Sequence, residues 1–181
     1  TIDASGLVVS PGFIDLHSHA MSRFGQQLQA MDGVTTALEL EAGVYPIDAL
    51  PRLIGSKAVI NYGSSTSHLA VRQRVVEKIE KPHLLSSVKP LYSIQDSGTF
   101  GRNNAAFTQQ ASVQQRKEIQ THLQQGITDG GLGIGLLLDY LSTAVNIEEL
   151  SMVFRVAAES AVPVFIHLRR GLPGDPSGLE E

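Results

Sequence analysis

Five side chains of this sequence are candidates to hold a metal ion together, and two of them, His17 and His19, lie only two positions apart. Asp15, His17 and His19 alternate along an apolar segment that follows a Pro-Gly turn. In an extended chain, alternate residues point to one face, so the two imidazoles lie about 7 Å apart and can converge on one ion. Imidazole is a ligand of zinc and of several other divalent metals. The pattern alone also suits one hydrogen-bonded core histidine beside a loop histidine.

Two glutamates are candidates for a carboxylate ligand. Residues 35–41 (TTALELE) have the composition of a strand, and a period of two places Glu39 and Glu41 on the same face. A carboxylate binds zinc and can bridge two cations. Glu41 lies nearer to the end of the strand and is our preferred ligand, with Glu39 as the alternative. One or both could instead face solvent or pair with a lysine.

A third histidine, His167, lies near the end of another apolar segment, residues 162–168 (VPVFIHL). An imidazole in such a place is costly to leave without a partner, which favours a metal ligand or a hydrogen-bonded core residue. Arg169 follows two residues later. Its guanidinium could bind the carboxylate of a substrate through two parallel hydrogen bonds.

The candidate ligands must be positioned by strands and helices that alternate along the chain. Strands are predicted at residues 13–19, 35–41, 58–62, 132–138 and 162–168, and helices at 26–31, 46–57, 112–125 and after Asn146. Gly126 is expected to end the third helix. Asn146 and Glu149 are expected to form a capping box at the start of the fourth. The alternation predicts a parallel α/β sheet, whose functional site lies at the carboxyl ends of the strands.

Composition excludes several classes of protein. The 181 residues predict one domain. Fourteen Lys and Arg against eighteen Asp and Glu give a net charge of −4, which argues against a nucleic-acid partner. The longest apolar run, residues 132–138, is far shorter than the roughly 20 residues of a membrane span, and residues 1–9 do not resemble a signal peptide. A cytoplasmic location is therefore expected. The chain has no cysteine, so it has no disulfide and no thiolate ligand.

Residues 11–19 (PGFIDLHSH) resemble the P-G-F-I-D-x-H-x-H motif of the metal-dependent amidohydrolase superfamily. Further segments are similar, in the same order, to the N-acyl-D-amino-acid deacylase branch of that superfamily. They are DGVTT at 32–36, Ser67-His68 with Arg72, GLG at 131–133 with Tyr140, and VFIHLR at 164–169. The resemblance covers nearly all of the chain except most of residues 68–107.

The resemblance implies a (β/α)8 TIM-like barrel, of which the chain holds about the first five β/α units. Residues 1–12 would then be the lead-in from a missing β-sandwich, and residues 13–181 a partial barrel with a loop-rich insertion at about 68–107. In the superfamily, a histidine of the sixth strand and an aspartate general base of the eighth complete the site. We therefore expect the chain to be an excerpt of a longer protein that supplies the remainder of the barrel.

The resemblance also implies one or two divalent ions, usually zinc, with His17, His19 and His167 as ligands. The deacylase branch bridges its ions with a cysteine of the second strand, and many other amidohydrolases use a carboxylated lysine of the fourth. This chain has neither, so Glu41, or Glu39, takes that place in our hypothesis.

Two further residues carry weaker expectations. Tyr140 aligns with a tyrosine near the substrate and could donate a hydrogen bond to the developing oxyanion, although a buried tyrosine with a satisfied hydroxyl is the other reading. His68 could support a metal ligand from behind, or be a structural histidine of a loop.

The predicted function is hydrolysis of a small linear amide, at a carbon–nitrogen bond other than a peptide bond, by a metal-activated water. An N-acyl-D-amino acid is the preferred substrate. One alternative is a cyclic amide hydrolase of the dihydroorotase or hydantoinase kind, against which the missing lysine of the fourth strand counts. The other is a non-catalytic fragment that binds a metal or has a structural role.

Overall fold

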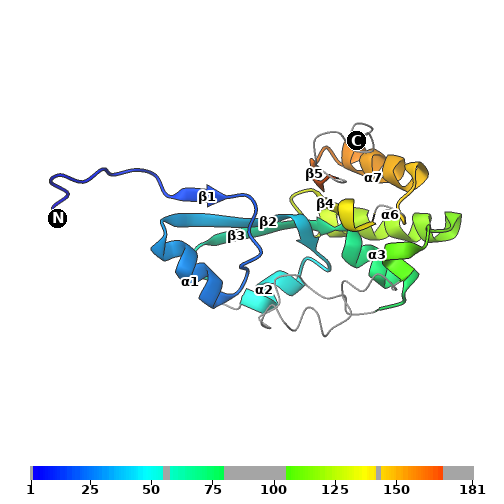
Figure 1. Cartoon of the computed structure of the whole chain (residues 1–181), viewed down its shortest axis with the longest axis horizontal. Coiled ribbons are helices and arrows are strands. Elements are labelled where there is room, and N and C mark those ends of the chain that lie inside the picture. The colour runs from blue at the N-terminus through cyan, green and yellow to red at the C-terminus, as the bar shows by residue number, and fades with distance from the viewer. Residues whose placement is uncertain (1, 55–57, 80–104, 142–143, 169–181) are drawn as a thin grey trace.

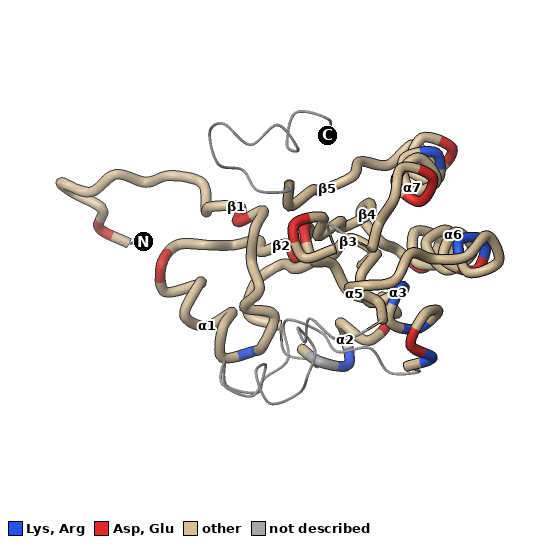
Figure 2. The backbone as a smooth tube through the Cα atoms, turned by 45° about the vertical axis from the view of Figure 1, so that its right-hand side comes forward, with Lys and Arg blue, Asp and Glu red and all other residues tan. Residues whose placement is uncertain are grey.

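The computed structural model describes residues 2–54, 58–79, 105–141 and 144–168. Five parallel strands form one sheet in the order of the sequence. They are β1 (Phe13–Asp15), β2 (Val34–Val44), β3 (Asn61–Ser67), β4 (Ile134–Leu137) and β5 (Val164–His167). The sheet curls, with the helices along its outer side (Figures 1 and 2). This is part of a (β/α)8 barrel, about five units of it, as the sequence predicted.

The helices are α1 (Arg23–Met31), α2 (Ala49–Ile54), α3 (His68–Val76), α5 (Ala105–Thr108), α6 (Val113–Thr128) and α7 (Ile147–Glu159), with a 3-10 helix, η1, at Asp139–Leu141. Four of them begin at a polar cap, whose side chain accepts a hydrogen bond from the backbone N–H three residues further on. The caps are Ser22 of α1, Ser67 of α3, Ser112 of α6 and Asn146 of α7. None of the helices in these described ranges is long and apolar enough to cross a membrane.

The bounds of two strands, β1 and β3, differ from the predicted ones. β1 ends at Asp15, whose side chain accepts a hydrogen bond from the backbone N–H of His17, so the extended alternation predicted through His19 stops there. β3 runs through the polar segment 63–67, which the sequence predicted as a loop. The hydroxyls of Ser64 and Ser65 donate to backbone carbonyls of β2, which satisfies these polar side chains inside the sheet.

The predicted end of α6 needs correction, whereas the predicted start of α7 at Asn146 is confirmed. α6 continues through Gly126 to Thr128, and a side chain at Gly126 would come within 2.5 Å of Thr66, so this glycine lets the helix lie close to β3. At α7, Asn146 accepts from the backbone of Glu149 as predicted. The side chain of Glu149 points instead to His68 and Arg72, so the reciprocal half of the capping box does not form.

The region predicted as a loop-rich insertion begins with the buried helix α3. His68, Arg72 and Glu149 are each 0% exposed. Arg72 donates to the carboxylate of Glu149 and to the backbone oxygens of Ala106 and Gln109, while His68 Nε2 lies 2.9 Å from Glu149. These bonds tie α3, the α5 segment and α7 together, so the start of the region belongs to the packed body of the fold. Residues 80–104 lie outside the described residues.

This buried cluster makes stability depend on pH. Burial alone would raise the pKa of Glu149, but the hydrogen bond and charge of His68 and the charge of Arg72 outweigh it and leave that pKa below its ordinary value of 4.5. A depressed folded-state pKa stabilises the fold above pH 4.5, and the stabilisation is lost as the pH falls through the folded-state value.

We therefore expect the free energy of unfolding, measured in urea, to fall more steeply between about pH 5 and pH 3 in the wild type than in Glu149→Gln. The variant is less stable at neutral pH, and the gap between the two proteins should narrow as the pH falls. A gap that stays constant with pH would contradict the assignment.

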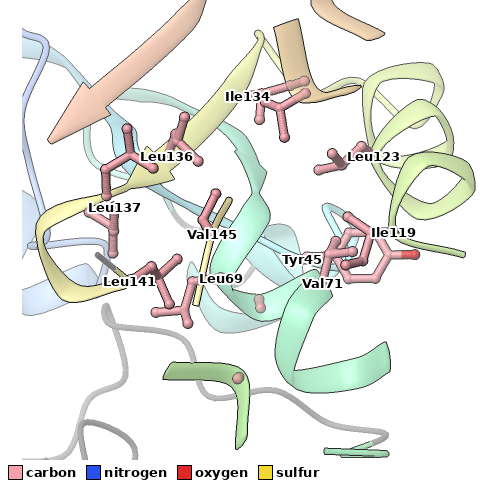
Figure 3. Close-up of a cluster of buried hydrophobic side chains, with 14 of the residues drawn as sticks. Tyr45, Leu69, Val71, Ile119, Leu123, Ile134, Leu136, Leu137, Leu141 and Val145 are labelled. Atoms are coloured by element: carbon pink, nitrogen blue, oxygen red, sulfur yellow. The ribbon is translucent and has the colours of Figure 1, made fainter. Parts of the chain in front are cut away.

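The main hydrophobic core lies between the sheet and helices α3, α6 and α7. Leu69 and Val71 of α3 belong to the same buried cluster as Ile119 and Leu123 of α6 and the apolar side chains of β4 (Figure 3). A smaller cluster, made of Met21, Ala37, Val44, Leu50 and Ile54, packs under α1 and α2. Both clusters include residues of β2, which also carries the candidate glutamates.

Candidate metal centre

The candidate ligands come from the carboxyl ends of three strands. The loop after β1 carries His17 and His19, β2 carries Glu39 and Glu41, and β5 ends at His167. Because β1, β2 and β5 are parallel members of one curled sheet, their ends meet on the same side of the barrel. Residues separated by up to 150 positions in the chain therefore lie together.

Glu41 lies at the centre of this group. Its Oε1 atom is 3.2 Å from His17 Nε2 and 3.5 Å from His19 Nε2. Its Oε2 atom is 3.2 Å from His167 Nδ1. His17, His19 and Glu41 each offer one ligand atom, and the three atoms all lie within 4.8 Å of one another. Thus Oε1 of Glu41 faces His17 and His19, and Oε2 faces His167.

These separations fit a metal ion. Ligand bonds of about 2.0–2.1 Å in a tetrahedron place neighbouring ligand atoms about 3.3 Å apart. The distances from Glu41 Oε1 to His17 Nε2 and His19 Nε2, 3.2 and 3.5 Å, bracket that value, and His167 Nδ1 lies 3.2 Å from the other oxygen, Oε2. Three imidazoles and one carboxylate also form a donor set that suits zinc and several other divalent ions. The two oxygens of Glu41 suit a carboxylate that bridges two ions.

Glu39 lies on the same face of β2, and its carboxylate contacts the imidazole of His19. Its carboxylate oxygens are 2.8 and 3.0 Å from His19 Nδ1, and its side chain is 1% exposed. The hydrogen bond to Glu39 raises the pKa of His19 above its ordinary value, against the effect of partial burial, and the charges of both glutamates add to the rise. A proton held on Nδ1 leaves Nε2, the atom nearer Glu41, free to bind an ion.

Glutamine at position 39 tests this orienting contact. We expect Glu39→Gln to weaken zinc binding by about 10- to 100-fold, because the carboxylate that fixes the His19 tautomer is replaced by an amide of the same shape. Competition with a chromophoric chelator measures the affinity. Unchanged affinity in a folded variant would contradict the orienting role.

Two glycines let β2 bend where it carries Glu41. The register of β2 against β3 is irregular between Glu39 and Val44, and Gly43 has a φ of +67° in that interval. In β4, a side chain at Gly135 would come within 2.6–2.7 Å of the backbone oxygens of Leu40 and Glu41. Gly135 lies inside the predicted strand 132–138, where a glycine is a signal of close backbone approach.

The other predicted site residues have different positions. Tyr140, in η1 after β4, packs its ring against His167, with centroids 5.2 Å apart, and is 46% exposed. His68 Nε2 lies 2.9 Å from Glu149 in the buried cluster, and the contact behind a candidate ligand that the structure shows is that of Glu39 with His19. Asp15 bonds the backbone of His17 rather than sharing its face. Arg169 lies outside the described residues.

Comparison with known proteins supports the fold. No family model and no curated protein sequence matches the chain. Among solved structures, the N-acyl-D-glutamate deacylase of Bordetella bronchiseptica, complexed with zinc and a phosphonate inhibitor that mimics the tetrahedral intermediate, matches 98% of this chain with a TM-score of 0.65 and 23% identity. D-aminoacylase, described as defining a novel subset of amidohydrolases, matches 94% with a TM-score of 0.56 and 16% identity.

The chain spans 38% of the length of the N-acyl-D-glutamate deacylase and 36% of that of D-aminoacylase. Another D-aminoacylase structure, with a TM-score of 0.57, concerns the functional role of a binuclear metal centre in that enzyme. At 16–23% identity these likenesses show the fold. The chain therefore has the fold of part of the (β/α)8 barrel of these structures, in agreement with the fold that the sequence resemblance implied.

Proposed function

We propose that the polypeptide containing this chain is a metal-dependent amidohydrolase that cleaves a linear amide, most like an N-acyl-D-amino acid. The observation that carries the proposal is the convergence of His17, His19 and His167 on the carboxylate of Glu41. Its position at the carboxyl ends of the strands, in a fold shared with two deacylases, supports the same reading.

In this proposal, His17, His19, His167 and Glu41 hold one or two zinc ions. Polarisation of the amide carbonyl and activation of the attacking water are the chemistry that bound zinc supplies. His19 donates its Nδ1 proton in a hydrogen bond to Glu39 and presents Nε2 to the site. The buried Glu39 carboxylate adds negative charge behind that ring, which strengthens the imidazole as a ligand.

Tyr140 is the proposed donor to the substrate carbonyl. Its ring lies against His167 and is partly exposed, so the side chain borders the proposed metal ligands on the open side. A phenol O–H directed at the oxygen that becomes negative during the attack lowers the barrier selectively in the transition state.

Phenylalanine at position 140 removes this donor while keeping the ring. We expect Tyr140→Phe to lower kcat by about 100-fold with little change in KM or in zinc content. Steady-state kinetics and elemental analysis on the same preparation measure the three quantities. An equal loss of zinc would contradict a role confined to the substrate.

The substrate class is tested with the longest polypeptide that contains the chain, loaded with zinc. N-acyl-D-amino acids, their L enantiomers and cyclic amides such as dihydroorotate and hydantoins form the panel. We expect hydrolysis of the D series to be fastest. Faster opening of a cyclic amide would contradict the proposed substrate, and no hydrolysis by a zinc-loaded protein would contradict the proposed activity.

The guanidinium of Arg169 is our candidate for binding the substrate carboxylate. We expect Arg169→Met to raise KM, because it removes this guanidinium.

A further inference from the structure

The side chain of Gln29 connects helix α1 to the loop that carries His17 and His19. Its Nε2 atom donates to Ser18 Oγ at 2.8 Å and lies 3.3 Å from Asp15 Oδ2. Both acceptors belong to the short segment between the end of β1 and the start of α1. Ser18 lies between the two histidines in the sequence and is 4% exposed.

The two acceptors that Gln29 holds are also the groups that fix the backbone around the histidines. Asp15 Oδ1 accepts from the backbone N–H of His17 at 3.0 Å, and Ser18 Oγ accepts from that of Ala20 at 3.3 Å. The N–H of Ser18 donates to Leu38 O of β2 at 3.1 Å, next to Glu39. The loop is thus fastened to β2 on one side and to α1 on the other.

We propose that Gln29 is a positioning residue for the metal centre, which holds the loop so that His17 and His19 face Glu41. This inference rests on the proposed function. β1 has only three residues and ends at Asp15, so the regular ladder of the sheet does not fix the loop that follows. Side-chain hydrogen bonds then set the place of the ligands, and ligands held in place before the ion arrives bind it more tightly.

The chemistry of the glutamine side chain fits this role. Its amide nitrogen has two hydrogens and can serve the carboxylate of Asp15 and the hydroxyl of Ser18 together. Within the described residues, Gln29 Oε1 is buried and has no hydrogen-bond partner. An unpaired buried oxygen costs stability, so packing of α1 alone does not favour an amide at this position. The contact with the ligand loop accounts for it.

Gln29→Met, which keeps the size of the side chain and removes its donors, tests the proposal in the longest polypeptide that contains the chain. Gln27→Met is the matched control, because Gln27 is exposed on the same helix. We expect Gln29→Met to weaken zinc binding by about tenfold in chelator competition and to change the visible spectrum of the cobalt-substituted protein. Amide hydrogen exchange of residues 16–20 in the metal-free protein should accelerate. Gln27→Met should match the wild type in all three measurements.

Ser18→Ala is a second, independent test of the proposal, and it replaces Gln29→Met if that variant does not fold. It removes the nearer acceptor of the Gln29 amide. The double variant should therefore lose less zinc affinity than the product of the two single fold losses. Wild-type affinity in both single variants would overturn the positioning role and leave the proposed function standing. A folded wild type that binds no zinc would overturn the proposed function and the positioning role together.

Discussion

Replacing Glu41 by glutamine is expected to lower the zinc affinity of the chain by at least about a hundredfold. Binding of structural zinc is worth roughly 10–16 kcal/mol, so one of four ligands carries about 3 kcal/mol, or slightly more than a factor of a hundred in affinity. Glu41 faces all three histidines, and its amide analogue has one neutral oxygen in place of two charged ones. Calorimetry or chelator competition measures the change.

Glu159→Gln is the control for Glu41→Gln, because it removes the same charge from an exposed position at the end of α7. We expect it to leave the affinity unchanged. The comparison with Glu39→Gln is equally informative. Replacing Glu39, which orients His19, should lower the zinc affinity less than replacing the ligand Glu41. A larger loss at Glu39 than at Glu41 would exchange the two roles.

Methionine at position 72 is expected to destabilise the fold by about 3–5 kcal/mol, the cost of removing one partner from a buried ion pair. Arg72 is 0% exposed and binds the carboxylate of Glu149 and two backbone oxygens. Its loss leaves those acceptors buried, with only His68 still facing the carboxylate. Urea unfolding followed by circular dichroism measures the change.

Arg52→Met is the matched control for Arg72→Met. Arg52 also pairs with a carboxylate, that of Asp48, but both side chains are 65% exposed, so little change in stability is expected. The double variant Arg72→Met, Glu149→Leu should be more stable than Arg72→Met alone, because it removes the unpaired charge. An equal loss of stability in Arg72→Met and Arg52→Met would contradict the importance of burial for the Arg72–Glu149 pair.

The order of strands and helices was predictable because most strands are apolar and the helices follow them in alternation. β4 and β5 lie within the predicted segments 132–138 and 162–168, since each is a run of large apolar residues. β3 was displaced in the prediction because its residues 63–67 are small and polar. Their hydroxyls are satisfied by carbonyls of β2, a long-range contact that local composition does not reveal.

The candidate site was predictable in its residue types and less so in its geometry. Alternation placed Glu39 and Glu41 on one face, and the structure brings both to the histidines. Which glutamate lies among all three imidazoles depends on the irregular stretch of β2 and on its close contact with Gly135. Likewise, His68 and Glu149 are 81 positions apart, so their pairing depends on how the helices pack.

Metal content, measured by elemental analysis after zinc loading and desalting, tests the central claim most directly. The comparison is made in the longest polypeptide that contains the chain, between the wild type and a His17→Ala, His19→Ala variant, each shown to be folded by circular dichroism. The account predicts one or two zinc ions per wild-type chain and loss of the ion held by His17 and His19 in the variant. A folded wild-type chain that retains no zinc, or a variant that retains as much as the wild type, would contradict it.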